Sequence, residues 1–110
     1  MILQKPIRRA DFAHCVHKNF GEYMVKLVAD LEKEIIAYDA EWHADLEAEL
    51  LAIGSINKNL WGFNYYPDND MLEYNSLINI RPMINKSSDI LDADICVGVE
   101  RAFRKWVLDE

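Results

Sequence analysis

Four polar side chains alternate with apolar residues in one stretch of the chain, and their types could bind a metal ion or move a proton. They are His43, Asp45, Glu47 and Glu49. If the stretch is a β-strand, its two-residue period places all of them on one face. An imidazole nitrogen with carboxylate oxygens is a ligand set for zinc, manganese or iron. Because His43 and Glu47 would stand roughly 13 Å apart along a strand, one ion would need further ligands from neighbouring strands.

Neighbouring strands of the same predicted sheet add polar residues to this face. We expect these to be Asn64, Glu73, Asn75, Asn79 and Arg81. A sheet that is covered on one side exposes its other face to water, where polar residues belong without doing any chemistry. Arg81 could equally pair with Glu73 or Glu47 across the sheet. The sequence therefore leaves this polar sheet face open between a candidate site and an ordinary solvated surface.

The cysteines give a weaker signal for chemistry. Cys15 lies close to His14 and His17, and an imidazole can activate a thiol as a nucleophile. Adjacent residues of a helix point in different directions, however, and no third group orients the pair. Because the sequence shows no secretory signal, we expect Cys15 and Cys96 to be reduced, partly buried thiols in a cytoplasmic protein.

Composition and charge exclude several classes of protein. Nineteen acidic and twelve basic residues give a formal net charge of −7, which repels phosphate backbones, so we expect no nucleic-acid binding. No apolar run approaches the roughly 20 residues that cross a bilayer, so we expect no membrane span. A chain of 110 residues, 51% of them hydrophobic, can build one core, and we expect a single domain over residues 1–110.

Helices are expected in the first third of the chain. A brief helix is predicted over residues 8–18, after a short strand at Ile2 and Leu3. Apolar residues at helical spacing then predict a longer amphipathic helix over residues 24–35. They are Met24, Leu27, Val28, Leu31 and Ile35.

Residues 41–52 carry two conflicting signals. Ala, Glu and Leu fill residues 40–52 and favour a helix. The strict alternation that begins at His43 favours a strand. From propensity and period alone, both a strand and a continuation of the preceding helix stay open.

The second half of the chain is clearer. Residues 60–66 and 71–81, joined by a turn at residues 67–70, predict a β-hairpin. In its second strand, alternation sends Ile78 and Ile80 into the core and presents Asn79 and Arg81 on the other face. A rigid strand that presents an amide and a guanidinium is a candidate for recognising an anionic or amide-bearing group.

A final helix follows a loop at residues 82–88. Asp92 can cap it, and its apolar stripe comprises Ile95, Val99, Ala102, Phe103 and Trp106. With this helix we expect an α+β fold, in which a small antiparallel sheet of about three to four strands has helices packed on one face.

Three segments carry a resemblance to a known family. They read WHADLE at 42–47, LWGFN at 60–64 and SLINIRP at 76–82. Over nearly the whole chain, their order and spacing resemble the small bacterial and cyanobacterial proteins of domain of unknown function 5674. None of the segments is a recognised catalytic signature, so the resemblance implies no activity.

The resemblance bears on two local questions. The family usually has glycines where this chain has Asp39 and Ala40, which implies a break in a long helix and a strand from about Glu41. After its Arg-Pro the family usually has Gly-Asn-Arg-Ser, whereas this chain has INKS at 84–87. Any role that the family's glycine or arginine has at these positions is therefore not expected of this chain.

Two hypotheses about function follow. We expect a non-enzymatic binding or interaction domain that self-associates into a homo-oligomer, since edge strands and aromatic surface would be covered by pairing. The alternative is a small metal-dependent hydrolase or ligand-binding enzyme that uses the polar sheet face, with His43, Asp45 and Glu47 as metal ligands or general base. Arg81 would be its anion clamp. The sequence specifies neither the ligand nor a cofactor.

Overall fold

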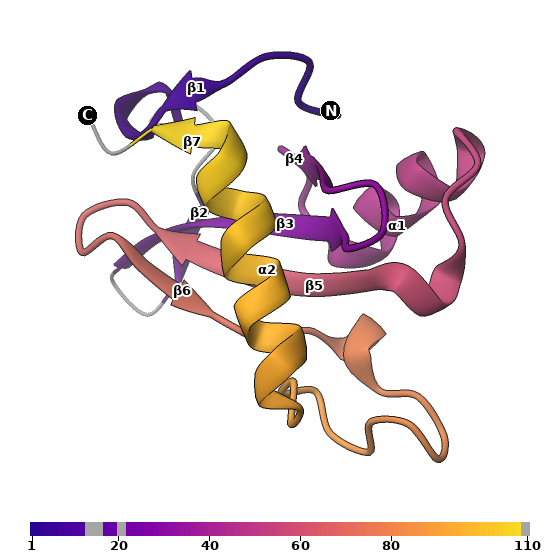
Figure 1. Ribbon diagram of the computed structural model, residues 1–110. Helices are drawn as coiled ribbons and strands as arrows, with labels where there is room; N and C mark the ends of the chain where they lie inside the picture. The colour runs from indigo at the N-terminus through magenta and orange to yellow at the C-terminus, as the bar shows by residue number, and fades with distance from the viewer. Residues whose placement is uncertain (13–16, 20–21, 109–110) are drawn as a thin grey trace.

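An antiparallel sheet of five strands is the main body of the protein (Figure 1). The computed structural model describes residues 1–12, 17–19 and 22–108. The strands are β2 (His17–Asn19), β3 (Glu22–Asp30), β4 (Ile35–Tyr38), β5 (Leu60–Tyr66) and β6 (Met71–Glu73). Strand β3 is central. Strand β5 pairs with one edge of β3, and β2 and β4 pair with the first and last parts of its other edge.

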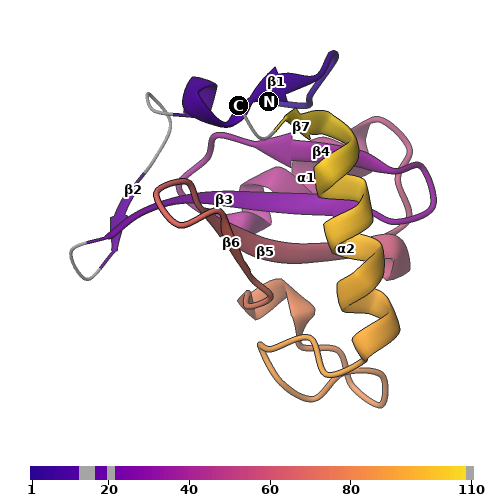
Figure 2. The ribbon, with the colours of Figure 1, turned by 60° about the vertical axis from the view of Figure 1, so that its left-hand side comes forward.

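The helices α1 (His43–Ala52) and α2 (Ala93–Trp106) lie on opposite faces of this sheet (Figure 2). On one face Phe103 of α2 meets Phe63 of β5 edge to face, with ring centroids 5.9 Å apart. On the other, Leu46 and Leu50 of α1 pack against Val28 of β3. The predicted α+β class, small antiparallel sheet and C-terminal helix are confirmed. The helices divide between the two faces instead of sharing one.

Helix α2 forms for the local reasons that the sequence indicates. The carboxylate of Asp92 accepts a hydrogen bond of 2.8 Å from the backbone N–H of Asp94, and Val99, Ala102 and Phe103 are fully buried. The chain does not end with this helix as expected, because β7 (Val107–Leu108) follows and pairs in parallel with β1 (Ile7–Arg8). Neither α1 nor α2 is long and apolar enough to cross a membrane.

The helix predicted over residues 24–35 is wrong, because this segment is the hairpin of β3 and β4. Val25 and Val28, on opposite faces of β3, are both fully buried. A strand that is covered on both faces is apolar at nearly every position, and such a run also contains the spacings of a helix. Asp30 starts the turn between the strands, and its Oδ1 accepts two backbone N–H hydrogen bonds from the turn.

The strand predicted over residues 41–52 is also wrong, because helix α1 occupies this segment. Of its alternating apolar residues only Leu46 and Leu50, one helical turn apart, are buried. The helix propensity of Ala, Leu and Glu prevailed over the two-residue period. The break implied before the segment is present at Asp39, whose φ of 69° lies in the left-handed region that favours glycine.

The N-terminal helix predicted over residues 8–18 is replaced in the described residues by the end of β1, a 3-10 turn at Arg9–Phe12 and β2. His14 and Cys15 lie outside the described residues. The short strand expected at Ile2 is reduced to a single bridge with β4. Strand β1 pairs with β7 from the far end of the chain, and local patterns carry no signal for such a contact.

The hairpin of β5 and β6 is confirmed, but its second strand is shorter than the predicted residues 71–81. A 3-10 turn follows at Leu77–Asn79 and changes the side-chain period from two to three. Asn79 and Arg81 are therefore buried, whereas Ile80 is exposed. The expectation that this strand presents Asn79 and Arg81 on an open face is wrong.

Asn79 takes the place of a neighbouring strand beside β5. Its amide donates to the carbonyl oxygen of Gly62 at 2.9 Å and accepts from the N–H of Gly62 at 2.8 Å. Residue 62 must be glycine for the segment to come this close, because a Cβ there would stand 2.6 Å from Cβ of Ser76. The LWGFN and SLINIRP segments are therefore two halves of one structural contact.

Arg81 extends this contact along β5. Its guanidinium donates hydrogen bonds to the carbonyl oxygens of Leu60 and Lys58 and lies 4.2 Å from the ring centroid of Trp61. A cation stacked on an aromatic ring and bonded to carbonyls is a structural clamp.

We predict that Arg81→Met lowers the melting temperature by about 8–10 °C, because hydrogen bonds from a charged group to buried carbonyls contribute about 2 kcal/mol. Thermal unfolding followed by circular dichroism at neutral pH measures this. Arg101→Met is the matched control, since Arg101 is exposed on α2. Equal melting temperatures for the two variants would contradict the structural role of Arg81.

Candidate functional site

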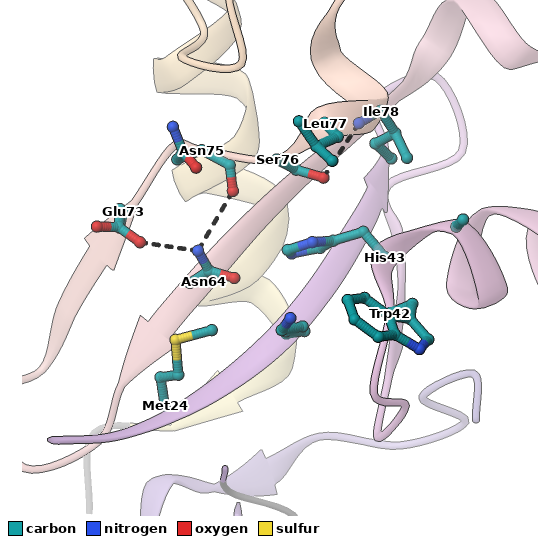
Figure 3. Close-up of a pocket in the computed structure, with 11 residues that line it drawn as sticks. Met24, Trp42, His43, Asn64, Glu73, Asn75, Ser76, Leu77 and Ile78 are labelled. Carbon is teal, nitrogen blue, oxygen red and sulfur yellow. Dashed lines mark hydrogen bonds between the residues drawn. The ribbon is translucent and has the colours of Figure 1, made fainter. Parts of the chain in front are cut away.

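Four of the candidate residues lie together in one pocket of about 320 Å³ (Figure 3). His43 is the first residue of α1, Asn64 lies on β5, Glu73 lies on β6 and Asn75 follows β6. The other residues that line the pocket are Met24, Lys26, Trp42, Ala44, Ser76, Leu77 and Ile78. The pocket therefore forms where the start of α1, the sheet and the segment after β6 meet.

The remaining candidates lie outside this pocket. Helix residues two apart point in different directions, so Asp45 does not share the side of His43, and Asp45 is exposed. Glu47 accepts a hydrogen bond of 2.9 Å from the side-chain amide of Asn57. Asn79 and Arg81 are buried and make the structural contact with β5.

The proposed metal-ligand set is not assembled. It depended on a strand face shared by His43, Asp45 and Glu47, and α1 provides no such face. Within residues 1–12, 17–19 and 22–108, no three His, Cys, Asp or Glu side chains lie close enough to hold a metal ion.

A row of three polar residues crosses the floor of the pocket. Asn64 is the pairing partner of Lys26 on one side and of Glu73 on the other. Residues directly opposite one another in a sheet project from the same face. The row therefore carries a cation, an amide and a carboxylate in that order, and the predicted polar sheet face exists here in part.

Asn64 is the residue whose hydrogen bonding is incomplete. Its Nδ2 donates to Oε1 of Glu73 at 2.8 Å and to the backbone oxygen of Asn75 at 3.2 Å. Both partners are acceptors, so the orientation of the amide is fixed. Oδ1 is buried and, in the described part of the chain, has no hydrogen-bond partner. It points toward the imidazole ring of His43 (Figure 3).

His43 is held in one tautomer by the sheet. Its Nε2 lies 2.9 Å from the carbonyl oxygen of Phe63, and because a carbonyl only accepts, Nε2 carries the proton. Burial lowers the pKa of His43 below its ordinary value, and the charge of Lys26 adds to this effect. The bond to Phe63, the nearby side chain of Asn64 and the charge of Glu73 oppose it. His43 is therefore neutral at physiological pH. The ring lies close to the amide of Asn64 without a hydrogen bond of normal geometry to its Oδ1.

The start of α1 and Lys26 place positively polarised and charged groups on the other side of the pocket, although the acidic Asp45 also lies in the first turn of α1. Trp42 occupies the N-cap position without a side-chain capping bond, so the first amides of the helix carry the positive end of its dipole. The ammonium of Lys26 lies 5.2 Å from the ring centroid of Trp42. Trp42 is 60% exposed, which leaves most of its surface open to a bound molecule.

Sequence reasoning missed Lys26 and Trp42 as site residues. Lys26 fell on the solvent face of the helix that was predicted in place of β3. A strand interpretation would have aligned it with Met24, which lines the same pocket. Trp42 belongs to the WHADLE segment, but a tryptophan that precedes a helix gives no chemical signal by itself.

Comparison with known proteins agrees with the expected resemblance. The family model for a protein of unknown function, DUF5674, matches residues 1–106. No curated protein and no solved structure matches the chain.

We predict that His43 makes stability depend on pH in the mildly acidic range. Its pKa is lowered from 6.5 in the folded protein, so the unfolded chain takes up the proton first. The stability that neutral His43 contributes is present above pH 6.5 and is lost as the pH falls toward the folded pKa. Urea unfolding midpoints at about pH 7.5 and about pH 5 measure the loss.

His43→Gln is the comparison, because its amide can donate to the same carbonyl oxygen but does not titrate. The wild-type protein should lose more stability than this variant between the two pH values. Parallel losses in both proteins would show that His43 is not the titrating group.

Proposed function

The chain belongs to the DUF5674 family, and we propose that it is a non-enzymatic binding domain that holds a small polar molecule in the pocket between α1 and the sheet. The unpartnered amide oxygen of Asn64 carries this proposal. A buried acceptor without a donor costs about 1–3 kcal/mol, and folded proteins rarely leave one unmet. A ligand N–H group would supply the missing bond.

Access to this oxygen involves His43. The oxygen is covered, and the imidazole ring toward which it points lies at the side of the pocket (Figure 3). Binding through Oδ1 therefore requires the ring to rotate, and we propose that this rotation accompanies ligand binding. Because His43 contributes a single hydrogen bond to a backbone carbonyl, its displacement costs less than a break in the sheet.

The hydrolase alternative has less support. Of its assigned residues only His43 lines the pocket, and the ring already uses its N–H for the carbonyl oxygen of Phe63. Arg81, assigned as the anion clamp, is 8% exposed and bonded to backbone carbonyls. A binding role needs none of these residues to act as a catalyst.

Self-association is a second candidate, and the segment that follows β6 favours it. Large apolar side chains that are at least half exposed gather there. They are Leu77, Ile80, Met83, Ile84 and Leu91. Met83, at the tip of a turn closed by hydrogen bonds between Arg81 and Asn85, is 92% exposed. We propose that a second copy of the chain covers this surface.

We predict that small polar compounds bind in the pocket and that Asn64 is required. A library of small amines, amides and carboxylic acids would be screened by two-dimensional NMR of labelled protein. Saturable shifts should concentrate on the indole of Trp42 and the amide of Asn64. Asn64→Leu should abolish them, whereas Asn57→Leu, at an exposed position in the 3-10 turn between α1 and β5, should keep them. The absence of saturable shifts at the pocket would contradict the proposed binding function.

We predict a molar mass above the monomer value of 12.8 kDa in light scattering at micromolar concentration. Met83→Ser combined with Ile84→Ser should shift the protein to monomer, since it removes two adjacent, strongly exposed apolar side chains at the tip of the turn. Val97→Ser, at an exposed apolar position on α2, is the control and should leave the mass unchanged. A wild-type protein of monomer mass would contradict self-association.

A further inference from the structure

The floor of the pocket has two ends of opposite charge. Lys26 stands at one end of the row across the sheet and Glu73 at the other, with Asn64 between them. A ligand with a single charge would leave one of these ends without a counter-charge. A ligand with both charges compensates both ends.

The end at Lys26 fits a carboxylate. The ammonium of Lys26 is held over the ring of Trp42, beside the uncapped start of α1. Backbone N–H groups at a helix start bind anionic oxygens, and a lysine next to them adds a full positive charge. Both sources of positive potential come from elements that line the pocket.

The end at Glu73 fits an ammonium. Oδ1 of Asn64 lacks a donor, and the carboxylate of Glu73 receives the Nδ2 of the same side chain on Oε1 at 2.8 Å. An ammonium has three N–H donors. Once the ring of His43 has moved, an ammonium has enough donors for both the amide oxygen and the carboxylate, which a neutral hydroxyl with one donor does not.

The spacing of the strands and the apolar walls of the pocket restrict the chemical class of the ligand further. Lys26 and Glu73 are two strand spacings apart, about 10 Å at the backbone, whereas Lys26 and Asn64 are one spacing apart, about 5 Å. A ligand whose ammonium lies on Oδ1 of Asn64 must therefore carry its two charges close together. Apolar side chains line the rest of the pocket, and they come from Met24, Trp42, Leu77 and Ile78. An apolar group on the ligand would contact them.

From this geometry we infer that the ligand is an α-amino acid with an apolar side chain. The inference rests on the proposed function, since it assigns a chemical class to the molecule in the same pocket. The carboxylate of the ligand lies at Lys26 and the start of α1, and its ammonium lies at Asn64 and Glu73.

The test compares leucine with two analogues that each lack one charge. They are 3-methylbutylamine, without the carboxylate, and 4-methylpentanoic acid, without the ammonium. Each would be titrated into the full chain and followed by NMR shifts at the indole of Trp42. Leucine and phenylalanine should bind, and each single-charge analogue of leucine should bind at least about tenfold more weakly than leucine.

Variants that remove the charge of Lys26 or of Glu73 show which of these residues binds the carboxylate of the ligand and which binds its ammonium. Lys26→Met should weaken the binding of leucine and of 4-methylpentanoic acid but leave the affinity for 3-methylbutylamine unchanged. Glu73→Gln should weaken the binding of leucine and of 3-methylbutylamine but leave the affinity for the acid unchanged. Lys105→Met is the control, because Lys105 is exposed on α2 and outside the pocket, and it should change none of the affinities.

The outcomes separate the ligand class from the proposed function. If leucine and phenylalanine leave the pocket resonances unshifted while another polar compound shifts them, the amino-acid class is wrong and the binding function stands. Equal affinity for leucine and either analogue would also overturn the class. If no compound binds at the pocket, the proposed function itself fails.

Discussion

The hydrogen bonds between the side chain of Asn79 and the backbone of Gly62 are the contact on which the rest of the structure depends. Strand β6 pairs with β5 only from Asn64 to Tyr66, so the first half of β5 lacks a strand on that edge. Buried backbone groups without partners are costly. The amide of Asn79 supplies both a donor and an acceptor to Gly62, and Arg81 continues the pattern at Leu60.

This contact also explains why the family-specific segments carry no catalytic signature. Asn85 reinforces it, donating to the backbone oxygens of Asn79, Ser87 and Asp89. At Ile84 and Lys86 the chain differs from the pattern that its resemblance to the family implied, and both side chains are exposed. Asn85, which does the bonding, lies between them and is buried. The departures therefore change the surface of the turn and leave its anchoring intact.

The pocket follows from the same arrangement. Because the segment after β6 is fixed against β5, Ser76 and Leu77 form one wall of the pocket, and the start of α1 forms the opposite one. The sheet between them presents Asn64 with an unmet acceptor. An incomplete hydrogen bond inside an otherwise well-anchored frame is a feature that folding alone does not require.

The sequence by itself determined the elements whose signals act within a few residues. The cap at Asp92 and the apolar stripe of α2 predicted that helix, the turn after β5 predicted the hairpin, and the order of the predicted elements gave the α+β class. Asn64 and Glu73 were placed on a common sheet face because directly paired residues of a hairpin share a face.

Only the tertiary structure decided the elements whose signals depend on what covers them. Strand β3 has a helix-like apolar spacing because both of its faces are buried, and no local pattern reveals a second covering layer. Residues of α1 form a helix despite their alternating pattern, because their helix propensity is high and Leu46 and Leu50, one turn apart, pack against the sheet. Asn79 and Arg81 turned inward because backbone groups of β5, distant in sequence, needed hydrogen-bond partners. Pairing between distant segments is decided by the whole fold, and so was the pocket that these segments enclose.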